Sequence, residues 1–159
     1  MTRLARSVTA TAGLLAACAV IAVTAVGVGA KGTGKATSGT VYAAITHTVG
    51  KTENAAGQVN DTVLGEGAVL FALTVGSGSK PGTVPLKGTL IAFTKTGELS
   101  GTDSVDLNVS ATGTTFTNGK FKLTKGLGAQ KGHSFIGTFT GTASSPTGPY
   151  VFHEKGIYK

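Results

Sequence analysis

Residues 120–142, KFKLTKGLGAQKGHSFIGTFTGT, carry the pattern that decides the fold. In the first half, Phe121 and Leu123 alternate with lysine and threonine, and in the second half Phe135 and Phe139 alternate with threonine and isoleucine. Apolar residues at every second position are typical of a strand with one buried face. Several glycines separate the two halves, so the stretch predicts a β-hairpin.

The same two-residue period recurs along most of the chain after residue 40, with turn signals about every 8–12 residues. No window shows a helical period, and we count seven or eight strands joined mostly by short turns. Short connections favour pairing between sequence neighbours. We therefore expect an all-β fold, an antiparallel up-and-down (meander) closed β-barrel of about eight strands and lipocalin-like form. A β-sandwich is the alternative, and the barrel is preferred because closure removes exposed edges.

Three segments each lead to a specific structural prediction. Residues 68–75, AVLFALTV, form a continuous apolar run that predicts a central strand buried on both faces. Residues 50–65 lack a regular period, so we predict a long loop with at most a short strand there. Asn118 followed by Gly119 predicts a tight turn or a β-bulge.

The N-terminal segment has the features of an export signal. Arg3 and Arg6 precede an apolar stretch at 8–28, and small residues lead up to Ala30. This pattern predicts a signal peptide at 1–30, cleaved after Ala30, and a secreted protein. Two alternatives stay open, namely a bacterial lipoprotein anchored through Cys18 and an uncleaved membrane anchor.

The remaining chain divides into a linker and one domain. We expect a flexible linker at 31–39, where the sequence is small and glycine-rich, and a single barrel domain at 40–159. Beyond Ala30 there are 12 lysines, no arginine, 7 acidic residues and no cysteine, which gives a net charge of +5. Without cysteine the domain has no disulfides and depends on its own core.

The charge pattern restricts the classes of partner that we expect. Arginine is the residue best suited to reading guanine and phosphate, so its absence disfavours specific nucleic-acid recognition. Lysines 120, 122, 125 and 131 form a basic run that suits an anionic cell-surface polymer, and a non-catalytic cell-surface or wall-associated protein with a Lys-rich face is therefore an alternative function. The run is otherwise a solvated strand face that discourages aggregation. Oligomeric state is left open by the sequence.

No motif in the sequence predicts a cofactor or a metal. Residues 126–132, GLGAQKG, differ from a dinucleotide fingerprint in glycine spacing and lead into a strand instead of a helix. The histidines at 47, 133 and 153 lack the spacing of a metal motif.

The candidate site is the interior of the barrel, because eight strands enclose room for side chains or one small guest. Asp103 is notable because its alternation places a carboxyl among apolar neighbours, where it requires a partner. We expect a small hydrophobic or aromatic ligand, with the following residues lining the cavity or orienting the guest: His47, Phe71, Phe93, Asp103, Phe135 and Phe139. A binding protein is favoured over an enzyme. An enzyme here would be an isomerase or cyclase that uses Asp103 and a histidine as general acid and base.

Two glycine-containing segments carry a family resemblance. These are residues 93–102, FTKTGELSGT, and 126–132, GLGAQKG, supported by LGEG at 64–67 and YVFH at 150–153. Together they resemble the C-terminal half of dirigent and allene oxide cyclase proteins. The resemblance implies an eight-stranded, lipocalin-like barrel with a mostly apolar cavity, which in that family holds a fatty-acid epoxide or a phenoxy radical during cyclisation or coupling. The catalytic acids and tyrosines of the family have no assigned counterparts in this chain.

Overall fold

The computed structural model describes residues 33–78, 80–145 and 148–159, and these residues form eight β-strands. The proposed signal peptide, its cleavage point at Ala30 and the alternative lipid site at Cys18 lie outside the described residues. No helix among the described residues is long and apolar enough to cross a membrane. The strands are β1 (Lys35–Val49), β2 (Thr52–Asp61), β3 (Gly65–Val75), β4 (Thr83–Thr94), β5 (Gly97–Ser110), β6 (Gly113–Gly128), β7 (Phe135–Ala143) and β8 (Tyr150–Tyr158).

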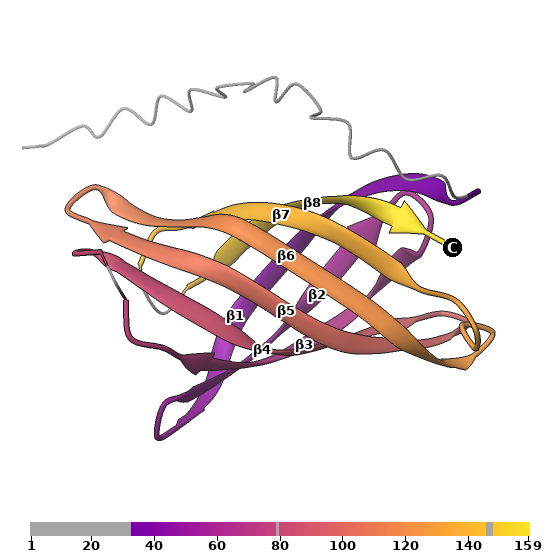
Figure 1. The fold of residues 1–159 in the computed structure, drawn as a ribbon, viewed down its shortest axis with the longest axis horizontal. Coiled ribbons are helices and arrows are strands. Elements are labelled where there is room, and N and C mark those ends of the chain that lie inside the picture. Colours follow the sequence, from indigo (N-terminus) through magenta and orange to yellow (C-terminus); the bar gives the residue numbers. More distant parts are fainter. Residues whose placement is uncertain (1–32, 79, 146–147) are drawn as a thin grey trace, which may run out of the picture. The chain divides into compact units, whose positions relative to one another are not determined.

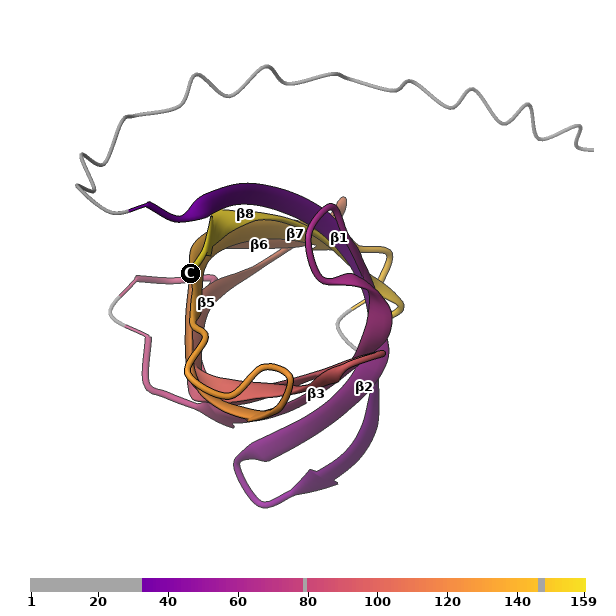
Figure 2. The ribbon, with the colours of Figure 1, turned by 90° about the vertical axis from the view of Figure 1, so that its right-hand side faces the viewer.

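The strands close into one barrel in sequence order. Each strand pairs antiparallel with the next, and β8 pairs antiparallel with β1. Figure 1 shows the strands side by side from indigo to yellow, and Figure 2 shows them as a ring. The predicted up-and-down barrel is confirmed, and the sandwich alternative is wrong because no strand is left unpaired at an edge of the described sheet.

The hairpin that decides the fold is present as β6 and β7. Phe121 and Leu123 are buried while the intervening lysines are exposed, as the alternation predicts. Phe135 and Phe139 are buried in β7. Asn118 has a positive φ of 55°, and the pairing with β7 shifts next to it. This position is therefore a bulge inside one long strand rather than a turn between two.

Aromatic rings fill the β6–β8 side of the barrel by lying over inward-facing glycines. Phe152 lies opposite Gly141, where an added Cβ would come within 2.4 Å of its ring. Phe139 lies opposite Gly119 in the same way, with a distance of 2.7 Å. These rings fill space that a side chain at the glycine position would otherwise occupy.

The β1–β2 hairpin extends past the ring at its turn, as Figure 2 shows in violet. Pairing of β1 with β8 ends at Ala43, and a register shift interrupts the pairing with β2 beyond Ile45. The last residues of β1 are therefore not backed by the barrel interior, and His47 and Val49 are exposed.

Three segments differ from their predictions. β1 begins at Lys35, inside the expected flexible linker, because these residues pair with the end of β8. The predicted loop at 50–65 contains the ten-residue strand β2, whose buried positions are Ala55, Val59 and Asp61 and include no aromatic or long aliphatic side chain. The run at 68–75 has one buried face only, since Leu70 is 44% exposed on the outside of β3. A barrel wall has no second layer to cover its outer face.

Candidate ligand site in the barrel lumen

Two small cavities lie inside the barrel and share aromatic walls. The space open to the centre of a water molecule is about 30 Å³ in the first cavity and about 20 Å³ in the second. Phe71, Phe139 and Phe152 line both. Because a water molecule needs roughly 10–15 Å³ by this measure, the first cavity has room for about two or three waters and the second for about one or two.

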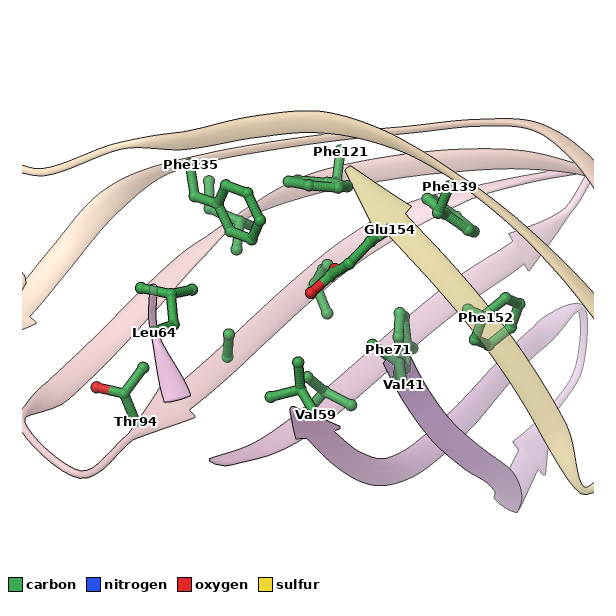
Figure 3. Close-up of a pocket in the computed structure, with 14 residues that line it drawn as sticks. Val41, Val59, Leu64, Phe71, Thr94, Phe121, Phe135, Phe139, Phe152 and Glu154 are labelled. Carbon is green, nitrogen blue, oxygen red and sulfur yellow. The ribbon is translucent and has the colours of Figure 1, made fainter. Parts of the chain in front are cut away.

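The first cavity contains one carboxyl group among apolar side chains. Figure 3 shows Glu154 extending from β8 into this space, between the rings of Phe121 and Phe139 on one side and the aliphatic side chain of Val59 on the other. Glu154 is 8% exposed, and its Oε1 atom has no hydrogen-bond partner among the described residues. Burial raises the pKa of Glu154 to about 7, and the negative charge of Asp61 adds to this rise.

Asp61 and Glu154 are neighbours because Gly39 lies between them in the sheet. Gly39 pairs with Asp61 on β2 and with Glu154 on β8, and an added Cβ on Gly39 would lie 2.8 Å from Glu154 Oε1. The two carboxyls have different surroundings. Asp61 accepts a hydrogen bond from the Thr37 hydroxyl and one at 2.7 Å from each of the backbone N–H groups of Val63 and Leu64. The Asp61 carboxyl is thus held by three hydrogen bonds, whereas Glu154 Oε1 has none among the described residues, and the raised pKa of Glu154 favours its protonated form.

The second cavity is lined by two acidic residues, Glu53 and Asp103, of which Asp103 is buried. Asp103 is 5% exposed, and neither of its carboxyl oxygens has a hydrogen-bond partner among the described side chains. Burial raises the pKa of Asp103 to about 7, and the backbone N–H of Asp103 itself partly offsets the rise. The same cavity is lined by Leu86, Val105 and Phe116, so the carboxyl faces an apolar space.

Four of the six predicted site residues lie in the lumen. Phe71 and Phe139 line both cavities, Phe135 lines the first, and Asp103 lines the second. Two predictions are corrected. Phe93 is 38% exposed on the outer face of β4, because its neighbours Ala92 and Thr94 point inward. His47 is exposed on the projecting β1–β2 hairpin.

The other histidines also lie outside the two cavities. His133 is half-buried in the turn after β6, where its ring stacks on Tyr158 with a centroid distance of 5.0 Å. His153 is exposed on β8, with its Nδ1 atom 3.4 Å from the Thr40 hydroxyl. The expected pair of Asp103 with a histidine is therefore not assembled within the described residues.

Glu154 is the main lumen residue that the sequence analysis missed. The sequence alternation could have predicted this position, because Tyr150, Phe152 and Glu154 lie on one face of the last strand. Phe121 was identified as inward-facing but not as part of a cavity wall, which it forms together with Phe135. Their rings meet edge to face with a centroid distance of 4.5 Å.

The chemistry of the lumen is that of two mainly apolar spaces, the first containing the Glu154 carboxyl and the second lined by Glu53 as well as Asp103. Within the part of the chain that the structure describes, no cluster of three or more His, Cys, Asp or Glu residues is arranged to hold a metal ion. Comparisons with known proteins show no relative, because no protein-family model, no curated protein and no solved structure matches this chain.

Proposed function

We propose that this protein is a β-barrel of the dirigent and allene oxide cyclase type that binds a small, mainly apolar or aromatic molecule in its lumen. The observation that carries the proposal is the Asp103 carboxyl, buried at the wall of a mainly apolar cavity with no hydrogen bond from another described residue to either oxygen. A buried carboxyl without a partner reduces stability, so its presence is better explained by a ligand than by packing.

The cavity chemistry defines the guest. The apolar walls favour a hydrocarbon or aromatic body, and Asp103 favours a single hydroxyl or amine donor on it. A guest larger than a few atoms requires the rings between the two cavities to move, because each space alone has room for only about one to three waters. A phenol or a short fatty alcohol meets these conditions.

Thermal-shift measurements with phenolics, fatty acids and fatty alcohols test the proposal. Asp103→Leu should raise the melting temperature of the free protein, because it removes an unpaired buried polar group. The same substitution should abolish stabilisation by the guest. Asp106→Leu, on the outer face of the same strand, is the matched control and should leave guest stabilisation unchanged. If no compound stabilises the wild type, or if Asp103→Leu binds equally well, the proposal fails.

A second candidate function is an isomerase or cyclase in the same lumen. The pKa values of Asp103 and Glu154, both raised to about 7, favour it because such groups can donate or accept a proton near neutral pH. Turnover of an epoxide-bearing fatty acid tests this function. Loss of turnover in both Asp103→Asn and Glu154→Gln, with guest binding retained in at least one, would support it. Absence of turnover in the wild type would count against it.

Export is part of the proposal. Cleavage after Ala30 removes the apolar segment and releases a chain that begins at Lys31, close to the start of β1. N-terminal sequencing of protein recovered from the medium should give Lys31 as the first residue. A lipid-modified Cys18 at the N-terminus would instead establish the lipoprotein alternative.

A further inference from the structure

Acidic side chains are unevenly distributed over the outer surface of the barrel. The linear sequence does not reveal this distribution. Within the described chain, β6, β7 and β8 contain one acidic residue, Glu154, and this side chain is buried in the lumen. The outer faces of these three adjacent strands therefore carry no negative charge. Glu66 lies away from this surface on β3, whereas Asp106 on the adjacent strand β5 borders it and accepts a hydrogen bond of 2.9 Å from Asn118 of β6.

Four exposed lysines lie on this acid-free surface. Lys120, Lys122 and Lys125 come from β6, and Lys155 comes from β8. We call them the lysine face. Lys131, which belongs to the basic run of the sequence, lies in the following turn instead. Lys155 is distant from the other three lysines in sequence and joins the lysine face only because of the strand pairing.

The strand register fixes the spacing of the lysine face. Lys120 is paired with Thr138 on β7, and Thr138 is paired with Lys155 on β8, so both lysines lie at one level of the barrel. Two strand spacings separate them by about 10 Å, and Lys122 lies about 7 Å further along β6 from Lys120. These separations are close to the Debye length of about 8 Å at physiological ionic strength, so the charges act together on one anionic partner.

The neighbouring side chains restrict the class of partner. Exposed threonines at 138 and 140 on β7 lie between the lysines and offer hydroxyl groups to a polar chain. Phe and Tyr side chains of these strands are buried or half-buried, and arginine is absent after Arg6, so stacking on nucleic-acid bases has little support. The wall is convex, and its exposed large hydrophobic residues among those described are Ile136 on β7 and Leu127 at the end of β6. Two such residues are too few to favour insertion into a bilayer.

We propose that the lysine face binds a linear acidic polysaccharide laid across β6, β7 and β8. The polymer's carboxylate or sulfate groups contact the lysines, and its sugar hydroxyls contact the intervening threonines. This site lies on the outer wall and is independent of the lumen and of its ligand.

Salt-dependent binding of the purified protein to heparin, used as the acidic polysaccharide, tests the inference. The triple variant Lys120→Gln, Lys122→Gln and Lys155→Gln should weaken binding at least about tenfold at 0.1 M salt and flatten its salt dependence. The matched control is Lys51→Gln, Lys80→Gln and Lys95→Gln, which removes the same charge from exposed turn positions and should change affinity by less than about twofold.

Several outcomes would overturn the inference. Equal losses in the two triple variants would mean that net charge alone attracts the polymer. Binding of the wild type to duplex DNA, or to phosphatidylglycerol vesicles, as tightly as to heparin would reject the polysaccharide as the preferred partner. Absence of heparin binding at 0.1 M salt would reject the site itself. Circular dichroism spectra identical to the wild type should accompany both variants, because all six lysines are exposed.

Discussion

Asp103 is the residue whose environment departs most from what its chemistry prefers. Its carboxyl is buried and unpaired, so folding favours the protonated form and raises the pKa from 3.8 to about 7. The folded state then binds the proton more tightly than the unfolded chain does. This contribution to the free energy of unfolding is at most about 4 kcal/mol. It is complete below about pH 4 and is lost as the pH rises to about 7.

Replacement of Asp103 by asparagine should remove this pH dependence. Between pH 5 and pH 7.5 the free energy of unfolding of Asp103→Asn should fall by about 2–3 kcal/mol less than that of the wild type. Urea denaturation at the two pH values measures the difference. Asp106→Asn, on the outer face of β5, should behave like the wild type. An Asp103→Asn variant with the wild-type pH dependence would show that Asp103 is ionised at both pH values.

At the scale of elements, the β6–β8 wall depends on cross-strand pairs of phenylalanine and glycine. Phe152 packs over Gly141, and it also meets Phe116 edge to face with a centroid distance of 4.9 Å. A side chain on Gly141 would displace both the ring and the neighbouring strand, because an added Cβ would also lie 2.7 Å from the carbonyl oxygen of Val151. The glycines in these strands are therefore packing positions rather than weak points.

Gly141→Ala should lower the free energy of unfolding by about 1–3 kcal/mol through overpacking. Thr140→Ala, one residue earlier and outward-facing, should change it by less than about 0.5 kcal/mol. In the double variant with Phe152→Leu, the loss should be smaller than the sum of the single losses, because the leucine no longer covers the glycine. Chemical denaturation of the four variants provides the comparison. Strictly additive losses would contradict the packing of Phe152 against Gly141.

The elements that could be predicted are those with clear two-residue alternation. β6 and β7 follow the pattern of Phe121 and Phe135, whereas β2 does not, because its buried positions mix small, branched and acidic side chains such as Ala55 and Asp61. Aromatic rings from other strands face β2 across the lumen, and the sequence of β2 itself does not indicate this packing. The same limit applies to the site. Asp103 stands out in its alternation, but the proximity of Glu154 to Asp61 follows only from the closure of β8 onto β1.

At the scale of the whole molecule, barrel closure places nearly all large aromatic side chains in one narrow lumen. Phe71, Phe139 and Phe152 then divide the open space into two cavities. The rings of Phe139 and Phe152 are perpendicular at a centroid distance of 5.5 Å, and Phe71 lies 6.1 Å from Phe152. The capacity of the barrel for a guest is thus set by this aromatic partition rather than by the number of strands.

Truncation of Phe139 should join the two cavities and create a binding site for a small aromatic molecule. Phe139→Ala should lose about 3–5 kcal/mol of stability, and indole should restore part of it because the compound binds only the folded state. Thermal denaturation with and without indole measures this effect. Phe139→Leu, a smaller truncation, should show the same effect at reduced size if the alanine variant does not fold. Phe93→Ala removes an equal ring from the outer face of β4 and should show no response to indole. If indole stabilises neither Phe139 variant, or stabilises the Phe93 variant equally, then Phe139 does not separate the two spaces.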